Sequence, residues 1–124
     1  MTQDRRSIES RRPRLRTSAL FLRDSKNEAT SLHTQIRVAF ESIYFCCVEI
    51  AASTGMPVET LEHPSYEIVD VALTSLDVPI EDRLTVELLV TWTESSTPFL
   101  PAMSVSEVRD VAARIFTATI ERFA

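Results

Sequence analysis

The chain has 124 residues and a formal net charge of −5, and 44% of its residues are hydrophobic and 25% charged. This length and composition are typical of one globular domain with its own core. It contains a single glycine, Gly55, whereas the phosphate-binding loops of dinucleotide, P-loop and kinase folds each need several. The sequence therefore argues against an ATP- or NAD-driven enzyme and against hairpin-rich β folds, and it predicts no cofactor.

No apolar run approaches the ~18 residues of a membrane span. The arginine-rich beginning has no continuous apolar segment before Arg23, so a secretory signal fits poorly. Two cysteines without such a signal favour a reducing compartment. We therefore expect a cytoplasmic protein without membrane contact. A mitochondrial presequence is the alternative, and Asp4 and Glu9 count against it.

Charge is divided unevenly along the chain. Residues 1–26 have a net charge of +5, and residues 27–124 have a net charge of −10. The segment 1–14 is polar and rich in arginine and serine, which predicts a disordered basic arm ahead of one helical domain, 15–124. Clustered cations neutralise phosphates, so the arm is a candidate nucleic-acid contact. The alternative is a docking or solubility tail, because the arm lacks aromatics and the body is acidic. The candidate contacts are Arg5, Arg6, Arg11, Arg12, Arg14 and Arg16.

The first expected elements are a short helix over 15–23 and a long main helix that starts near 30–31. The main helix ends at Thr54, because Gly55 suits the position after a helix and Pro57 cannot continue one. At 100° per residue the main helix has one broad apolar face, opposite Arg37, Glu41 and Glu49. This face contains Leu32, Ile36, Ala39, Phe40, Ile43, Cys47, Ile50 and Ala51.

Three further segments follow. An apolar period of 3.6 predicts a helix that begins at Pro64 and ends before Pro79. Residues 81–95 have an acidic first turn typical of a helix, although β-branched residues give them a strand-like alternation. A capping box, Ser104 to Glu107, starts the last helix. The expected apolar side of the segment 81–95 contains Leu84, Leu88, Leu89 and Trp92. Short connections between these helices predict an all-α, antiparallel, four- to five-helix up-and-down bundle.

The adjacent cysteines Cys46 and Cys47 raise the question of a reactive or metal-binding site. On a helix they point about 100° apart, so they cannot chelate one metal together. His33 lies thirteen residues before Cys46, roughly 20 Å along the helix, and His63 has no evident orienting acid. We therefore expect two buried, unreactive thiols, no metal site and no catalytic residue.

A second apolar pattern runs along the other side of the main helix. Val38, Phe45 and Ala52 recur every seven residues, which is typical of a helix-packing seam. The seam predicts either a homodimer or protein-partner interface, or a surface covered by the chain's own N-terminal helix. The covering residues in the second case are Leu15, Leu20 and Leu22.

Polar residues at helical spacing form one more candidate site. His33, Arg37 and Glu41 follow one another at intervals of four and could form a track for a phosphate or RNA backbone. The favoured alternative is a solvated helix edge with a local ion pair. Asp110 and Arg114, also four residues apart, predict another surface ion pair.

The segment SLHTQIRVAFESIYFCCVEIA, followed by two shorter helices and a capped last one, resembles bacterial HEPN-type helical bundles over about residues 30–124. Active HEPN ribonucleases carry an arginine followed, after four to six residues, by a histidine. Here Arg23 and His33 have nine residues between them, and no arginine precedes His63 at that spacing. The resemblance therefore implies an inactive, dimeric companion of nucleotidyltransferases or toxins that associates with RNA or a protein partner.

Taken together, these patterns favour a non-catalytic, self-associating helical interaction module. One alternative is a HEPN-like protein of RNA processing or of a toxin–antitoxin pair. Another is a nucleic-acid binder that uses the basic arm.

Overall fold

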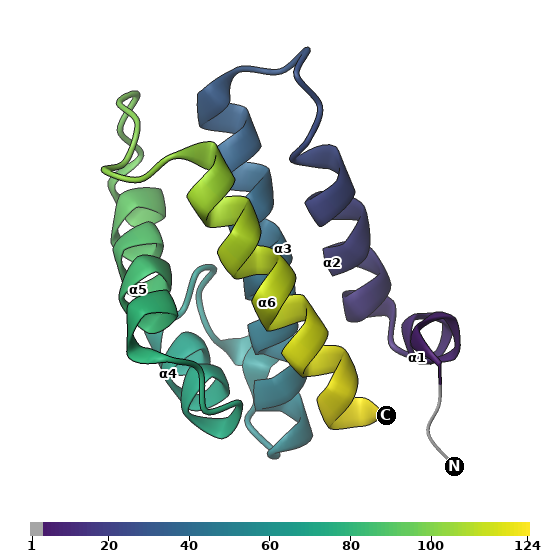
Figure 1. Cartoon of the computed structure of the whole chain (residues 1–124). Helices are drawn as coiled ribbons and strands as arrows, with labels where there is room; N and C mark the ends of the chain where they lie inside the picture. The colour runs from purple at the N-terminus through teal and green to yellow at the C-terminus, as the bar shows by residue number, and fades with distance from the viewer. Residues whose placement is uncertain (1–3) are drawn as a thin grey trace.

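The computed structural model describes residues 4–124, and every regular element in this part of the chain is a helix, without strands (Figure 1). Six α-helices and one short 3-10 helix (η1) follow in order. They are α1 (Arg5–Arg11), α2 (Pro13–Asp24), α3 (Leu32–Ser53), η1 (Val58–Thr60), α4 (Tyr66–Ser75), α5 (Ile80–Ser95) and α6 (Val105–Phe123). The all-α class expected from the sequence is confirmed.

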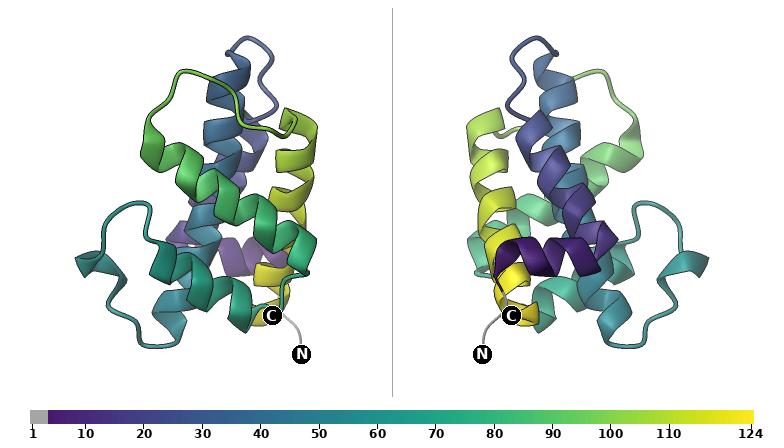
Figure 2. Two further views of the ribbon diagram at one scale, coloured as in Figure 1. Left: turned by 90° about the vertical axis from the view of Figure 1, so that its left-hand side faces the viewer. Right: turned by 90° about the vertical axis from the view of Figure 1, so that its right-hand side faces the viewer.

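The long helix α3 is the centre of the bundle, and α2, α6 and α4 make the most extensive contacts with it. Figures 1 and 2 show α2 and α5 running opposite to α3 and α6, in an antiparallel arrangement. The short helices α1 and α4 cross the ends of the longer ones. The expected antiparallel helical bundle is therefore confirmed, with α1 as an additional element.

The predicted apolar face of α3 is buried except at its first residue. Leu32 remains 54% exposed, because it is the first residue of the helix and burial begins one turn later, at Gln35 and Ile36. The helix also buries polar residues on the side that faces α2. These residues are Gln35, Ser42 and Glu49.

Serine caps fix where three helices begin. Ser31 Oγ accepts from Thr34 N at 3.1 Å, and Ser104 Oγ accepts from Glu107 N at 3.1 Å, as the capping box predicts. Ser65 is the cap of α4, so this helix begins at Tyr66 and not at the proline before the cap. At the end of α3, Gly55 has the positive φ of 93° expected there.

The expectation of a disordered arm is wrong for residues 4–14. Asp4 caps α1 by accepting a hydrogen bond from Ser7 N at 2.8 Å, and Ile8 is only 1% exposed. Arg5 lies over the Phe116 ring at 4.6 Å from the ring centroid. The composition of this segment is polar, but its buried isoleucine and the packed aliphatic parts of its arginines hold it against the bundle. Residues 1–3 of the predicted arm lie outside the described residues.

The segment 81–95 is helical throughout, but its buried side differs from the expected one. Leu84 and Leu88 point outward, 52% and 58% exposed. The β-branched Val86 and Val90 that resembled a strand pattern lie in the core instead. The buried side of α5 contains Asp82, Val86, Leu89, Val90, Trp92 and Thr93.

Candidate functional site

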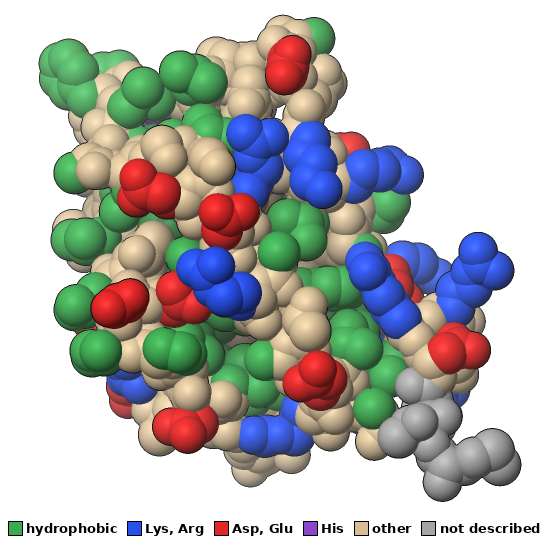
Figure 3. Space-filling model, viewed as in Figure 1, with side chains coloured by type: hydrophobic (Ala, Val, Ile, Leu, Met, Phe, Trp, Pro, Cys, Tyr) green, Lys and Arg blue, Asp and Glu red, His purple; other side chains and the backbone are tan. Residues whose placement is uncertain are grey.

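The outer face of α5 carries three large apolar side chains at intervals of four residues. Ile80 is 65% exposed, and Leu84 and Leu88 are more than half exposed. We call these three residues the α5 face. The left view of Figure 2 shows α5 crossing the front of the molecule with no other helix before it, and Figure 3 shows hydrophobic side chains gathered along the edge where α5 lies. Exposed apolar residues in a row are typical of contact surfaces.

The loop after α5 carries two further exposed apolar side chains. Phe99 is 76% exposed and Leu100 51% exposed. The backbone beneath Phe99 is held, because Trp92 Nε1 donates to its carbonyl oxygen at 2.9 Å and its own N–H donates to Thr97 Oγ1 at 3.2 Å. The exposed phenyl ring therefore projects from an anchored loop.

Charged residues flank the α5 face. Arg83 donates to Glu87 Oε1 at 3.0 Å and to Thr74 Oγ1 at 2.9 Å, and it also bonds Asp70 of α4. These contacts, with the hydrogen bond to Glu87 as the largest cause, raise the pKa of Arg83. Arg83 and Glu87 form one rim of the face, and Glu81 lies on the other side. The rim is charged and the centre apolar, as in many protein interfaces.

The predicted seam is largely an intramolecular surface. The Phe45 ring lies 5.6 Å from the Phe21 ring of α2, and Val38 and Ala52 are half-buried. The chain's own α2 thus provides cover for Phe45, chiefly through a phenylalanine that the sequence reasoning did not name. Of the three leucines expected to cover the seam, Leu15 is buried, Leu22 is partly buried and Leu20 is 44% exposed.

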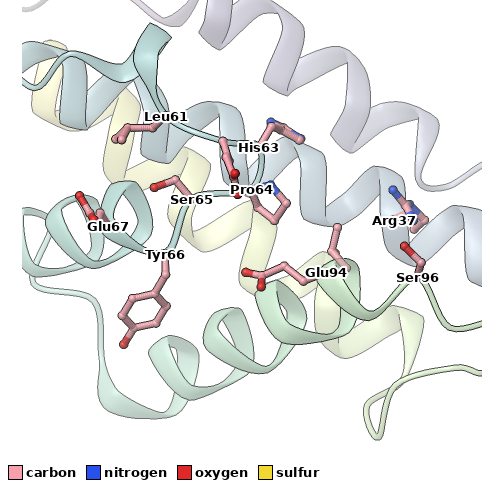
Figure 4. A pocket seen from close by; sticks show the side chains of 11 residues that line it. Arg37, Leu61, His63, Pro64, Ser65, Tyr66, Glu67, Glu94 and Ser96 are labelled. Carbon is pink, nitrogen blue, oxygen red and sulfur yellow. The ribbon is translucent and has the colours of Figure 1, made fainter.

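A polar cleft of about 780 Å³ lies between α3, the segment that leads into α4, and the end of α5. Figure 4 shows Arg37 and Ser96 at one end of it and Tyr66 and Glu67 toward the other, with Glu94 between them. This cleft combines polar groups from three parts of the chain.

Glu41 pairs with a residue that the predicted polar track did not contain. His63 Nε2 lies 3.0 Å from Glu41 Oε1, and the Tyr44 ring packs on the imidazole at 4.4 Å between centroids. The Tyr44 hydroxyl accepts from Ser65 N at 2.8 Å, which holds the segment beside the cleft. His63 was missed as a partner of Glu41 because the two residues are 22 positions apart.

His33 belongs to a different environment from Arg37 and Glu41. Its ring packs against that of Trp92 in a tilted arrangement, with 4.9 Å between centroids, and its Nε2 lies 2.9 Å from the carbonyl oxygen of Thr97. It therefore joins α3 to the loop after α5. The structure brings Arg37 and His63 to one cleft but leaves His33 outside its lining.

Both cysteines are free and fully buried. Burial raises the pKa of Cys46 to about 11, and it also raises the pKa of Cys47. Cys46 Sγ lies 3.2 Å from Ser18 Oγ, where serines let α2 and α3 approach closely. A protonated, inaccessible thiol is a poor nucleophile and a poor metal ligand. The two cysteines therefore serve packing.

No group of three or more His, Cys, Asp or Glu side chains in residues 4–124 is placed to hold a metal ion. Across the same residues, no helix has the length and apolar character that crossing a membrane requires.

The basic arm divides into packed and exposed arginines. Arg12 and Arg14 both bond Glu49, and Arg14 also bonds Glu59. Arg5 pairs with Glu9. Arg5 is nevertheless exposed, and so are the remaining candidates for nucleic-acid contact, Arg6, Arg11 and Arg16.

When the chain is compared with family models, with curated proteins and with solved structures, it matches none of them. No family match thus supports the HEPN-like resemblance. The all-helical architecture is the part of that resemblance that the structure bears out.

Proposed function

We propose that this chain is a non-catalytic helical interaction module of the cytoplasm that associates with itself, and that the α5 face is its contact surface. The observation that carries the proposal is the row Ile80, Leu84 and Leu88, each more than half exposed on one helix. Removing such side chains from water is the main driving force of protein association.

The α5 face is a better contact surface than the seam predicted from the sequence. Phe45, the largest side chain of the seam, already packs on Phe21. The seam residues Val38, Phe45 and Ala52 are already half-buried against the bundle, whereas each residue of the α5 face is more than half exposed. Among the described residues, nothing covers the α5 face, so association there needs no rearrangement of the bundle.

The direct test is the oligomeric state of the full chain as a function of concentration, measured by sedimentation velocity. We expect a reversible dimer that Leu84→Glu converts to a monomer, because a carboxylate in the centre of an apolar contact loses its hydration. Leu20→Glu, which changes a single exposed leucine on α2, is the matched control and should leave the dimer intact. A wild-type chain that is still monomeric at about 0.2 mM would refute the proposal. A dissociation constant of that order of magnitude corresponds to an association free energy of roughly −5 kcal/mol.

A second candidate function, HEPN-like RNA processing, is favoured by the cleft. Arg37 supplies a cation there, and His63 lies hydrogen-bonded to Glu41 at its edge. A phosphate-bearing strand would contact Arg37, although Glu94 and Glu67 in the same lining would repel it. Cleavage of single-stranded RNA that is lost in both Arg37→Ala and His63→Ala would support this candidate. Cleavage that persists in both variants would remove it.

A further inference from the structure

We infer that two copies of this chain pair through α5 in antiparallel orientation, about a twofold axis beside Leu84, and exchange the ion pair between Arg83 and Glu87. This inference rests on the proposed function, because it takes the α5 face as the contact surface. It goes further by naming the occupant of the face, the orientation of the second copy and the residues that select it.

The apolar row is symmetric about its middle residue. Ile80 lies four positions before Leu84, and Leu88 lies four positions after it. In an antiparallel pair, Leu84 packs against Leu84 of the second copy, and Ile80 packs against Leu88 at each end. One surface patch then contacts itself, which is the requirement for a closed twofold dimer. Every large side chain of the face finds an apolar partner.

The charged rim favours the antiparallel orientation over the parallel one. Arg83 and Glu87 lie on the same flank of the apolar row, at 100° per residue, and in antiparallel pairs each flank faces the equivalent flank of the second helix. Arg83 is one residue before Leu84 and Glu87 is three after it. In the antiparallel pair, Arg83 of one copy therefore lies two residues, roughly 3 Å along the helix axis, from Glu87 of the other copy. Each arginine can thus reach the glutamate of the other copy.

A parallel pair gives a less favourable distribution of charge. It would bring the two acidic first turns of α5 together, each with Glu81, and would align the two helix dipoles. Arg83 and Glu87 would then face the flank that holds Glu81 and Thr85, where Arg83 finds Glu81 but Glu87 finds no cation. In the antiparallel pair both members of the Arg83–Glu87 ion pair gain a partner, so electrostatics selects this orientation.

The size of the contact suggests reversible association. A pair of 16-residue helices is about 24 Å long and buries less than the roughly 800 Å² per partner of a typical stable interface. The expected assembly is a concentration-dependent dimer.

The first experiment is a charge exchange between two variants of the full chain. In Arg83→Glu both rim residues are acidic, and in Glu87→Arg both are basic, so each variant opposes its own second copy. We expect each to dimerise roughly fivefold or more weakly than wild type. An equimolar mixture should form heterodimers preferentially, seen by native mass spectrometry, because both exchanged pairs become complementary. Circular dichroism checks that each variant is folded.

The second experiment uses introduced thiols, which are the only accessible ones because Cys46 and Cys47 are fully buried. The probe is a bis-maleimide with a short spacer. In the antiparallel pair the two copies of position 80 lie ~12 Å apart along the helix axis, and the spacer is chosen to be shorter than this separation. Leu84→Cys should cross-link to itself. Ile80→Cys and Leu88→Cys should cross-link when mixed, but neither should do so alone. Leu20→Cys, on α2, should still dimerise but should give no cross-linked product.

Each outcome has a distinct meaning. Heterodimer preference together with the mixed cross-link supports the antiparallel pair. Self-cross-linking of both Ile80→Cys and Leu88→Cys would show a parallel pair and overturn the inference while leaving self-association through α5 intact. A mixture of charge variants without heterodimers would overturn the ion-pair exchange. Monomers in every sample, including wild type, would instead refute the proposed function itself.

Discussion

Arg12 and Glu49 join the junction of α1 and α2 to the C-terminal half of α3. Arg12 Nη1 donates to Glu49 Oε2 at 2.6 Å, and its guanidinium lies 3.7 Å from the centroid of the Phe123 ring. Arg14 donates to the second oxygen of Glu49 at 3.3 Å. The glutamate side chain is only 10% exposed. The buried carboxylate, bonded by two arginines, thus connects α3 to the start of α2, and Arg12 adds the contact with Phe123 of α6.

Loss of this carboxylate should destabilise the bundle. Glu49→Gln keeps the size of the side chain but leaves the guanidinium of Arg12 without its anion, and we expect the free energy of unfolding to fall by about 1–3 kcal/mol. Urea denaturation measures the change. Glu59→Gln is the control, because Glu59 also bonds Arg14 but its side chain is 77% exposed. Equal effects of the two substitutions would contradict a structural role for Glu49.

The helix α1 should contribute to stability through Ile8. This side chain is 1% exposed, so Ile8→Ala should lower the free energy of unfolding by about 2–4 kcal/mol. Arg6→Ala, two positions away on the exposed side of the same helix, should change it by about 0.5 kcal/mol or less. Thermal and urea denaturation of the two variants give the comparison. If the arm were disordered, neither substitution would change the free energy of unfolding.

The ion pair of Arg114 that stabilises the fold should be the one with Asp82 of α5, and not one with Asp110 of its own helix. Its Nε and Nη2 donate to the two carboxylate oxygens of Asp82 at 2.9 and 3.0 Å, and these hydrogen bonds are the largest cause of the raised pKa of Arg114. Asp82 is 8% exposed. We expect Asp82→Asn to lower the free energy of unfolding by about 1–2 kcal/mol.

The matched control for this ion pair is Asp110→Asn, four residues before Arg114 on the surface of α6. It should have an effect of about 0.5 kcal/mol or less. The opposite ranking of the two variants in urea denaturation would mean that the local pair expected from the sequence forms instead.

The thiols should make stability depend on alkaline pH. The pKa of Cys46 is raised from 9.0 to about 11 in the folded chain, so above pH 9 the unfolded chain loses this proton first. The free energy of unfolding should therefore decrease as the pH rises from about 9 toward 11. Urea denaturation across this range measures the slope, and Cys46→Ala should reduce it. An unchanged slope in the variant would show that another group is responsible.

The same burial predicts the reactivity of the cysteines. At pH 8 neither thiol of the native chain should react with an aromatic disulfide reagent within minutes, whereas both should react after denaturation. Rapid labelling of the native chain would show that the α2–α3 contact opens readily.

Several features of the fold follow from local sequence. Ser31, Gly55 and Ser104 mark helix ends correctly because capping involves only residues three or four positions away. The apolar face of α3 is also predicted, except at Leu32, because periodicity fixes which residues share a side. The prediction that the cysteines are buried packing residues agrees with their complete burial.

The rotation of α5 could not be read from its own pattern. Its sequence has apolar residues on almost every side, so either Leu84 or Val86 could have faced the core. Contact with the rest of the bundle determines the rotation of α5, because Arg114 of α6 bonds Asp82 on the inner side of the helix. The candidate contact surface, the α5 face, is a consequence of that choice.

By itself the sequence determined the helical class, the places where most helices begin and end, and the buried position of the cysteines. These depend on hydrogen bonds and periodicities within a few residues. Only the tertiary structure decided that Glu49 is buried, that Glu41 pairs with His63 and that Leu84 faces outward. Such pairings join residues tens of positions apart, and many partners are equally compatible with the local sequence. The packing of whole helices against one another selects among them.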